Sequence, residues 1–153
     1  MLKKGDRAPD FSLPDDSGNT VGLGDLLQKG PMLLYFYPAY FTPGCTKEAC
    51  EIRDMHEYIA DVGMTVVGIS PQDSQSHDSF RSKYQLPFPL LADPDKQAVK
   101  AYGVDGPLGI GVRRATFIIG TDKTIEDVMV ADFRIARHSD FIRAAVKRYR
   151  QPA

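Results

Sequence analysis

The chain has 153 residues, a formal net charge of −1, and ordinary fractions of hydrophobic (42%) and charged (25%) residues. This length predicts one domain over residues 1–153, large enough to bury a core without disulfides or metals. The small net charge excludes a global electrostatic field that would attract nucleic acid or a membrane surface.

The N-terminal residues MLKKGDRAPDF contain two lysines with no apolar run behind them, so no signal peptide is expected. No run of about 18 apolar residues occurs in the sequence, so no membrane-spanning helix is expected either. The expected location is a reducing cytoplasm. In that compartment, two closely spaced cysteines are more often catalytic or metal-binding than structural.

In chain order, the sequence pattern predicts alternating strands and helices. Short apolar runs at residues 32–37 and 64–70 predict two buried strands. Between them, residues 43–62 follow a helical pattern in which apolar residues recur every three or four positions. The polar residues 73–85 and the residues 94–102 predict two further helices.

The last third of the chain predicts a hairpin and a closing helix. Residues 115–120 and 124–131 predict two antiparallel strands joined by a Gly-Thr-Asp-Lys turn. Ser139 is a favourable N-cap, so an amphipathic helix is predicted over residues 139–150. This order of elements indicates a three-layer α/β fold with a mixed β-sheet flanked by helices. A thioredoxin-like fold is the commonest small fold of that description.

Both cysteines, Cys45 and Cys50, lie in one short segment, FYPAYFTPGCTKEACEIRD. Thr42 is a preferred N-cap residue, and the proline after it suits the first helical position, where no N–H is needed. Cys45 then falls in the first helical turn, where unpaired N–H groups and the positive end of the helix dipole favour the thiolate. It also follows strand 32–37, at the strand end where open α/β sheets place their functional sites. The pattern favours a nucleophile, with a buried structural cysteine as the alternative.

Several other chemistries do not fit the spacing. A phosphatase-type loop needs an arginine six residues after its cysteine, where this chain has Glu51. A zinc-protease helix needs a second histidine where Ala60 follows HEYI. The three histidines, His56, His77 and His138, are too scattered for a zinc-finger ligand set. The glycine-rich stretch GPLGIG lacks the dinucleotide and phosphate-loop patterns and predicts a flexible connection.

The segment YPAYFTPGCTKEACEIRD resembles the active-site segment of the peroxiredoxins, whose signature Pro-x-x-x-Thr-x-x-Cys falls on Pro38, Thr42 and Cys45. A second cysteine within CTKEAC is similar to the Q-type branch, also called the bacterioferritin comigratory proteins. The segments GDRAPDFSLPD, KYQLPFPLLAD, YGV and RATFII agree with this branch. Gly120 and the glycine-rich loop at residues 105–113 depart from the family pattern, and the C-terminal part matches only loosely.

The resemblance implies a thioredoxin fold and the thiol-dependent reduction of hydrogen peroxide and organic hydroperoxides. It assigns Cys45 as the peroxidatic cysteine, which becomes a sulfenic acid, and Cys50 as the resolving cysteine that captures the oxidised sulfur. It also implies that the Thr42 hydroxyl and Arg114 bind the peroxide oxygens and stabilise charge in the transition state. Pro38 would shield the sulfur from water.

For two charged residues, a second interpretation of their role stays open despite the resemblance. Arg114 alone could be a solvated charge at a strand end, as is expected for its neighbour Arg113. Glu48 matches the motif and is expected to hold the arginine, with a solvated helix face as the alternative.

The resemblance implies no metal or organic cofactor. The expected partners are a hydroperoxide substrate and thioredoxin or a related dithiol, which would reduce a Cys45–Cys50 disulfide. No nucleic acid or membrane partner is expected, and the chain is expected to be a monomer or a weak homodimer. Two other classes of function stay open, a non-enzymatic peroxide sensor and a general thiol–disulfide oxidoreductase. The absence of a Cys-x-x-Cys pair disfavours the second of these.

Overall fold

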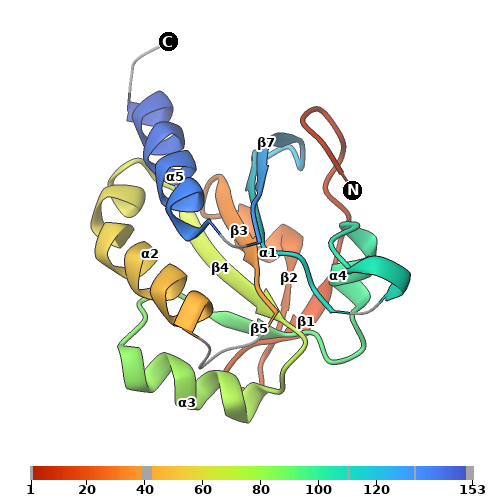
Figure 1. The fold of residues 1–153 in the computed structure, drawn as a ribbon. Helices are drawn as coiled ribbons and strands as arrows, with labels where there is room; N and C mark the ends of the chain where they lie inside the picture. Colours follow the sequence, from red (N-terminus) through yellow and green to blue (C-terminus); the bar gives the residue numbers. More distant parts are fainter. Residues whose placement is uncertain (1, 39–42, 110, 133, 151–153) are drawn as a thin grey trace.

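A computed structural model describes residues 2–38, 43–109, 111–132 and 134–150 of the chain. Its centre is a five-stranded sheet in the order β5-β4-β3-β6-β7 (Figure 1). The strands are β3 (Met32–Phe36), β4 (Thr65–Ser70), β5 (Leu90–Ala92), β6 (Ala115–Ile119) and β7 (Ile125–Val130). The pairs β3–β4 and β4–β5 are parallel, whereas β3–β6 and β6–β7 are antiparallel. The sheet is therefore mixed, as the sequence predicted.

Helices cover both faces of this sheet (Figure 1). They are α1 (Leu23–Leu27), α2 (Pro43–Asp61), α3 (Ser74–Tyr84), α4 (Gln97–Ala101) and α5 (Ile135–Arg150), with a short 3-10 turn, η1 (Pro107–Gly109). Residues of α2, α3 and α5 share one buried apolar cluster, and residues of α1 and α4 share the other.

The central strand β3 explains why two apolar layers form. All five of its residues are buried. Because side chains of a strand alternate between faces, Leu33 and Tyr35 pack beneath α2 and α5, while Leu34 and Phe36 pack on the opposite side. A continuous apolar run is typical of a strand covered on both faces. The three-layer, thioredoxin-like α/β fold expected from the sequence is confirmed.

The hairpin of β6 and β7 forms as predicted. Its turn is closed by hydrogen bonds from the Gly120 N–H to the Thr124 carbonyl and from the Lys123 N–H to the Gly120 carbonyl. Lys123 adopts a left-handed conformation with φ of 67°, which a tight turn requires. The hairpin sets the position of the residues just before β6 and just after β7.

An N-terminal hairpin of β1 (Ser12–Pro14) and β2 (Thr20–Gly22) was not predicted. Each strand has three residues, which is too short for a clear alternating pattern. The Asp15 carboxylate accepts hydrogen bonds from the N–H groups of Ser17 and Asn19 and so fixes the turn between β1 and β2.

Two predicted helix boundaries are wrong. The last helix begins at Ile135 rather than at Ser139. Ser139 lies inside the helix, and its hydroxyl donates to the Glu51 side chain on α2 instead of capping a helix end. The helix predicted over 94–102 spans only Gln97–Ala101. There the Asp93 carboxylate accepts the N–H groups of Gln97 and Val99, and Lys96 turns left-handed with φ of 56°.

Candidate active site

Cys45 lies in the first turn of α2, which follows the carboxyl end of β3 after residues 37–42. Its side chain is buried, with 2% of the residue exposed, whereas Cys50 on the same helix is half-buried. The two cysteines are not joined by a disulfide in this structure. The prediction that one continuous helix carries both cysteines is confirmed.

Arg114 connects the sulfur of Cys45 to a carboxylate. Its Nη2–H donates to Cys45 Sγ at 3.2 Å, and its Nη1–H donates to Glu48 Oε1 at 2.8 Å. The side chains of Arg114 and Glu48 are 7% and 2% exposed, so the alternatives of a solvated strand end and a solvated helix face are wrong for these residues. Gly44 allows this approach, since a Cβ there would lie 3.3 Å from Arg114 Nη2.

The backbone of Arg114 is held from the end of the hairpin. Its N–H donates to Asp132 Oδ1 at 3.1 Å, and its carbonyl accepts the Ala131 N–H at 3.1 Å. The second oxygen of Asp132 accepts hydrogen bonds from Arg113, which is half exposed. Asp132 therefore fixes two neighbouring arginines in different orientations, one toward Cys45 and one toward solvent.

Burial and charge shift the protonation of these groups. Burial raises the pKa of Glu48 to about 7, although Arg114 opposes that shift. Burial alone would lower the pKa of Arg114, but Glu48 and Cys45 beside it raise that pKa above its ordinary value. Arg114 is therefore a permanent cation at the sulfur, and a cation at that position favours the thiolate.

His138 completes the buried cluster from α5 and was not predicted as a site residue. It is fully buried, its Nε2 lies 2.8 Å from the Ala131 carbonyl oxygen, and its Nδ1 lies 2.9 Å from Thr116 Oγ1. Nδ1 also lies 3.7 Å from Glu48 Oε2. The sequence held one signal for the burial of His138. It lies three residues from both Ile135 and Phe141 and therefore falls on the apolar stripe of the helix.

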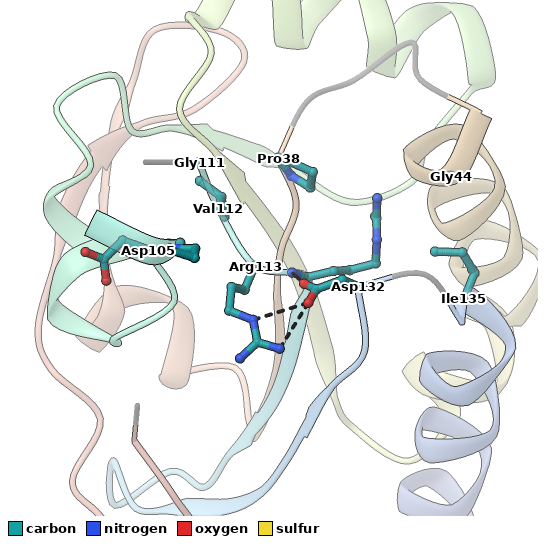
Figure 2. A pocket seen from close by; sticks show the side chains of 11 residues that line it. Pro38, Gly44, Asp105, Gly111, Val112, Arg113, Asp132 and Ile135 are labelled. Carbon is teal, nitrogen blue, oxygen red and sulfur yellow. Dashed lines mark hydrogen bonds and ion pairs between the residues drawn. The ribbon is translucent and has the colours of Figure 1, made fainter. Parts of the chain in front are cut away.

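A cleft of about 930 Å³ opens beside this cluster. Figure 2 shows Gly44 and Ile135 on the side of α2 and α5, with Asp105 on the opposite side and Pro38 near the end of β3. Val112 and Arg114 also line the cleft. A small electrophile that enters here meets the Arg114 guanidinium next to Cys45, and the Ile135 side chain lies on the same side of the cleft.

The structure brings together most of the residues selected from the sequence. Cys45, Glu48 and Arg114 are in contact through hydrogen bonds, and Pro38 lines the adjacent cleft. Thr42 lies outside the described residues. Within the described part of the chain, no cluster of three His, Cys, Asp or Glu side chains could hold a metal ion, and no helix is long and apolar enough to cross a bilayer.

Comparison with known proteins identifies the family. Residues 4–128 match the model of the AhpC/TSA family. The chain is 42% identical over 149 residues to chloroplastic peroxiredoxin Q of Arabidopsis thaliana, covering 94% of this chain and 68% of that protein. It is 38% identical over 152 residues to peroxiredoxin Bcp of Bacillus subtilis, covering 95% and 94% of the two chains.

A solved structure agrees with these relatives. The crystal structure of peroxidoxin BcpB from Mycobacterium tuberculosis superimposes with a TM-score of 0.90 at 39% identity, covering 96% of this chain and 97% of that one. The matches extend over the thioredoxin-like fold and over the segment that carries Cys45. The chain is thus a thiol peroxidase that belongs to the AhpC/TSA family, in its peroxiredoxin Q/Bcp branch.

Proposed function

We propose that Cys45 is the peroxidatic cysteine and that it reduces hydrogen peroxide and organic hydroperoxides. The thiolate gives an electron pair to one peroxide oxygen, the O–O bond breaks, and the other oxygen leaves as an alcohol or water after taking a proton. Cys45 becomes a sulfenic acid. The observation that carries this proposal is the contact of 3.2 Å between Arg114 Nη2 and Cys45 Sγ at the edge of an open cleft.

The neighbouring residues have separate roles in this proposal. Arg114 stabilises the thiolate and the charge that develops on the departing oxygen, because preorganised donors in a dry site act most strongly on developing charge. The Thr42 hydroxyl binds a peroxide oxygen, and Pro38 keeps water from the sulfur. Glu48 orients the guanidinium through its 2.8 Å hydrogen bond.

Cys50 is proposed to resolve the sulfenic acid by forming a disulfide with Cys45. On one continuous α-helix, Cα atoms five residues apart are separated by about 8.6 Å. A disulfide needs Cα atoms closer than about 7 Å. The first turns of α2 must therefore unwind before the bond forms, so amide exchange over residues 46–52 should be much faster in the disulfide form than in the reduced form. Equal protection in both forms would exclude this pairing or the continuous helix.

The remaining partners are proposed on the family resemblance. Thioredoxin or a related dithiol reduces the Cys45–Cys50 disulfide, and no metal or organic cofactor takes part. Residues 1–153 act as a single domain, as a monomer or weak homodimer, without nucleic acid or membrane. The cytoplasmic location expected from the sequence stays a prediction.

A turnover assay tests this function. The purified protein is given a hydroperoxide together with thioredoxin, thioredoxin reductase and NADPH, and the consumption of NADPH is followed. We expect many turnovers per protein molecule with wild type and none with Cys45→Ser. A single equivalent of peroxide consumed without turnover would favour a peroxide sensor, and rapid reduction of insulin disulfides would favour a general thiol–disulfide oxidoreductase.

A further inference from the structure

The buried cluster has more potential anions than cations. Within the described part of the chain, Arg114 is the one Lys or Arg side chain within ion-pair or hydrogen-bond distance of Cys45 and Glu48. A thiolate on Cys45 and a carboxylate on Glu48 would place two negative charges against that single positive charge. Because an uncompensated buried charge is strongly unfavourable, one of the two groups should hold a proton.

The surroundings favour the thiolate over the carboxylate as the retained anion. Cys45 lies in the first turn of α2, where unpaired N–H groups and the helix dipole stabilise a negative charge. Glu48 lies almost a turn further along the helix, away from those N–H groups, and is as deeply buried as Cys45. Glu51 on the same helix repels its charge, and burial already raises the pKa of Glu48 to about 7.

His138 offers an acceptor for a proton on Glu48. The Ala131 carbonyl can only accept, so Nε2 of His138 carries the hydrogen, and the neutral ring presents a lone pair at Nδ1. Burial lowers the pKa of His138 and keeps the ring neutral, with the bond to Ala131 opposing that shift. An ionised carboxylate has no hydrogen to donate to the Nδ1 lone pair. A protonated carboxyl group can donate its O–H hydrogen to it. Among the described residues, Glu48 Oε2 has no hydrogen-bond partner, and it lies 3.7 Å from Nδ1.

We propose that Glu48 is protonated when Cys45 is a thiolate, and that His138 is the positioning residue whose Nδ1 accepts this proton. The inference rests on the proposed peroxidase function. For this bond the carboxyl group must rotate so that Oε2 approaches Nδ1. The Thr116 hydroxyl, which lies 2.9 Å from Nδ1, then shares that lone pair or leaves it. Arg114 is left to neutralise the thiolate alone.

Glu48 then supplies the proton that the leaving oxygen takes in the reaction. The thiolate, the protonated Glu48 and a hydroperoxide ROOH give the Cys45 sulfenic acid, the Glu48 carboxylate and the alcohol ROH. The sulfur is oxidised, the O–O bond is reduced, and the proton passes from Glu48 to the leaving oxygen, directly or through water. Arg114 then neutralises Glu48 instead of Cys45, so the buried cluster keeps the same net charge throughout.

The charged and titratable groups that face this pair come from every neighbouring element. Cys45 and Glu51 lie on α2, Tyr35 lies on β3, and Arg114 precedes β6. Asp132 follows β7 and Arg137 lies on α5, and both act on His138 at longer range. Within the described part of the chain, neither Asp132 nor Arg137 forms an ion pair or hydrogen bond with Glu48, so the proton is shared within the Glu48–His138 pair.

Infrared difference spectroscopy can locate the proton without using peroxide. Cys45 is alkylated with iodoacetamide at pH 7 in a Cys50→Ser protein, which removes the charge of the Cys45 thiolate. Glu48 should then ionise, so a carboxylic-acid band should be lost and carboxylate bands should appear. The same signal should be absent when Glu48→Gln is added. Loss of an S–H band with no carboxyl change would place the proton on Cys45 and overturn the proposal, whether or not the protein turns over peroxide.

Three variants test the role of His138. His138→Leu removes the acceptor, so the carboxylic-acid band should move to higher frequency and the pH profile of Cys45 alkylation should move up by about one unit, a tenfold loss on its rising limb. His138→Gln keeps an amide oxygen as acceptor and should restore alkylation to within about threefold of wild type.

Thr116→Val provides an independent check if the leucine variant does not fold. It removes the competing hydroxyl from Nδ1, so the carboxylic-acid band should move to lower frequency as its hydrogen bond strengthens. A band that stays in place with Thr116→Val, or an alkylation profile in which His138→Gln behaves like His138→Leu, would show that His138 only fills space.

Discussion

The Ser139 hydroxyl on α5 donates a hydrogen bond to the Glu51 carboxylate on α2, one residue beyond Cys50. Three contacts between the start of α5 and the first turns of α2 follow one another, since Ile135 lies beside Gly44, His138 faces Glu48, and Ser139 bonds Glu51. The segment that must unwind for a Cys45–Cys50 disulfide is therefore the segment that α5 holds in place.

Ser139→Ala should accelerate disulfide formation once Cys45 is oxidised. A hydrogen bond to a charged group contributes about 1.5–3 kcal/mol, so its loss should favour the unwound form by roughly tenfold or more. The rate is measured by acid quenching and mass spectrometry after one equivalent of hydrogen peroxide. Ser79→Ala, whose hydroxyl donates to the Gln75 carbonyl on the exposed side of α3, is the matched control. Equal rates in Ser139→Ala and Ser79→Ala would mean that α5 does not limit the unwinding.

Arg114→Ala should slow the reaction of Cys45 with peroxide by about a hundredfold, since removal of one preorganised donor commonly costs that much. The pH profile of Cys45 alkylation should also move to higher pH, because the cation that favours the thiolate is gone. Arg113→Ala is the neighbouring control, because Arg113 pairs with Asp132 and does not contact Cys45. An Arg114→Ala profile that matches wild type would remove the proposed role of the guanidinium.

Glu48 should make the stability of the protein depend on pH. Burial raises its pKa from an ordinary value of 4.5 to about 7 in the folded chain, so the folded form binds the proton more tightly. The stabilising effect of the protonated carboxyl is complete below about pH 4.5 and is lost as the pH rises through 7, by about 3 kcal/mol in total. Urea unfolding of reduced wild type and Glu48→Gln at several pH values measures the difference. If the free energy of unfolding of wild type instead rises relative to that of Glu48→Gln as the pH increases, Glu48 is ionised throughout this range.

Ile135 should affect bulky hydroperoxides more than hydrogen peroxide. Its side chain lines the cleft (Figure 2), as Arg114 also does, and an apolar substituent of the substrate would pack on it. Partial loss of that contact in Ile135→Ser costs about 1 kcal/mol, so kcat/KM for cumene hydroperoxide should fall about fivefold while the value for hydrogen peroxide changes little. Leu108→Ser changes an exposed residue that does not line this cleft and is the control. A parallel fall for both substrates in Ile135→Ser would place Ile135 outside the substrate path.

Local patterns allowed much of this fold to be predicted from the sequence. The continuous apolar run of β3 and the Gly-Thr-Asp-Lys turn before β7 are signals contained in a few adjacent residues. Ser139 shows where such signals fail, because its hydroxyl forms a long-range bond to Glu51 in place of the expected cap. The three-residue strands β1 and β2 are too short to show a period.

The candidate site divides in the same way. Cys45 could be selected from its place after a strand and in the first turn of a helix, and Arg114 from the family motif. The family motif also predicted that Glu48 holds Arg114, but the burial of Glu48 and its approach to His138 depend on a residue 90 positions away in the chain. No spacing rule predicts such a contact, and an isolated buried histidine has no sequence motif.

In the proposed mechanism, Cys45 reacts with peroxide first and Cys50 acts on the product. The most direct test treats wild type, Cys45→Ser and Cys50→Ser with one equivalent of hydrogen peroxide in the presence of dimedone and maps the adducts by mass spectrometry. We expect a Cys45–Cys50 disulfide in wild type, a dimedone adduct on Cys45 in Cys50→Ser, and no adduct in Cys45→Ser. A dimedone adduct on Cys50 in Cys45→Ser, formed as fast as the Cys45 adduct in Cys50→Ser, would contradict the assignment.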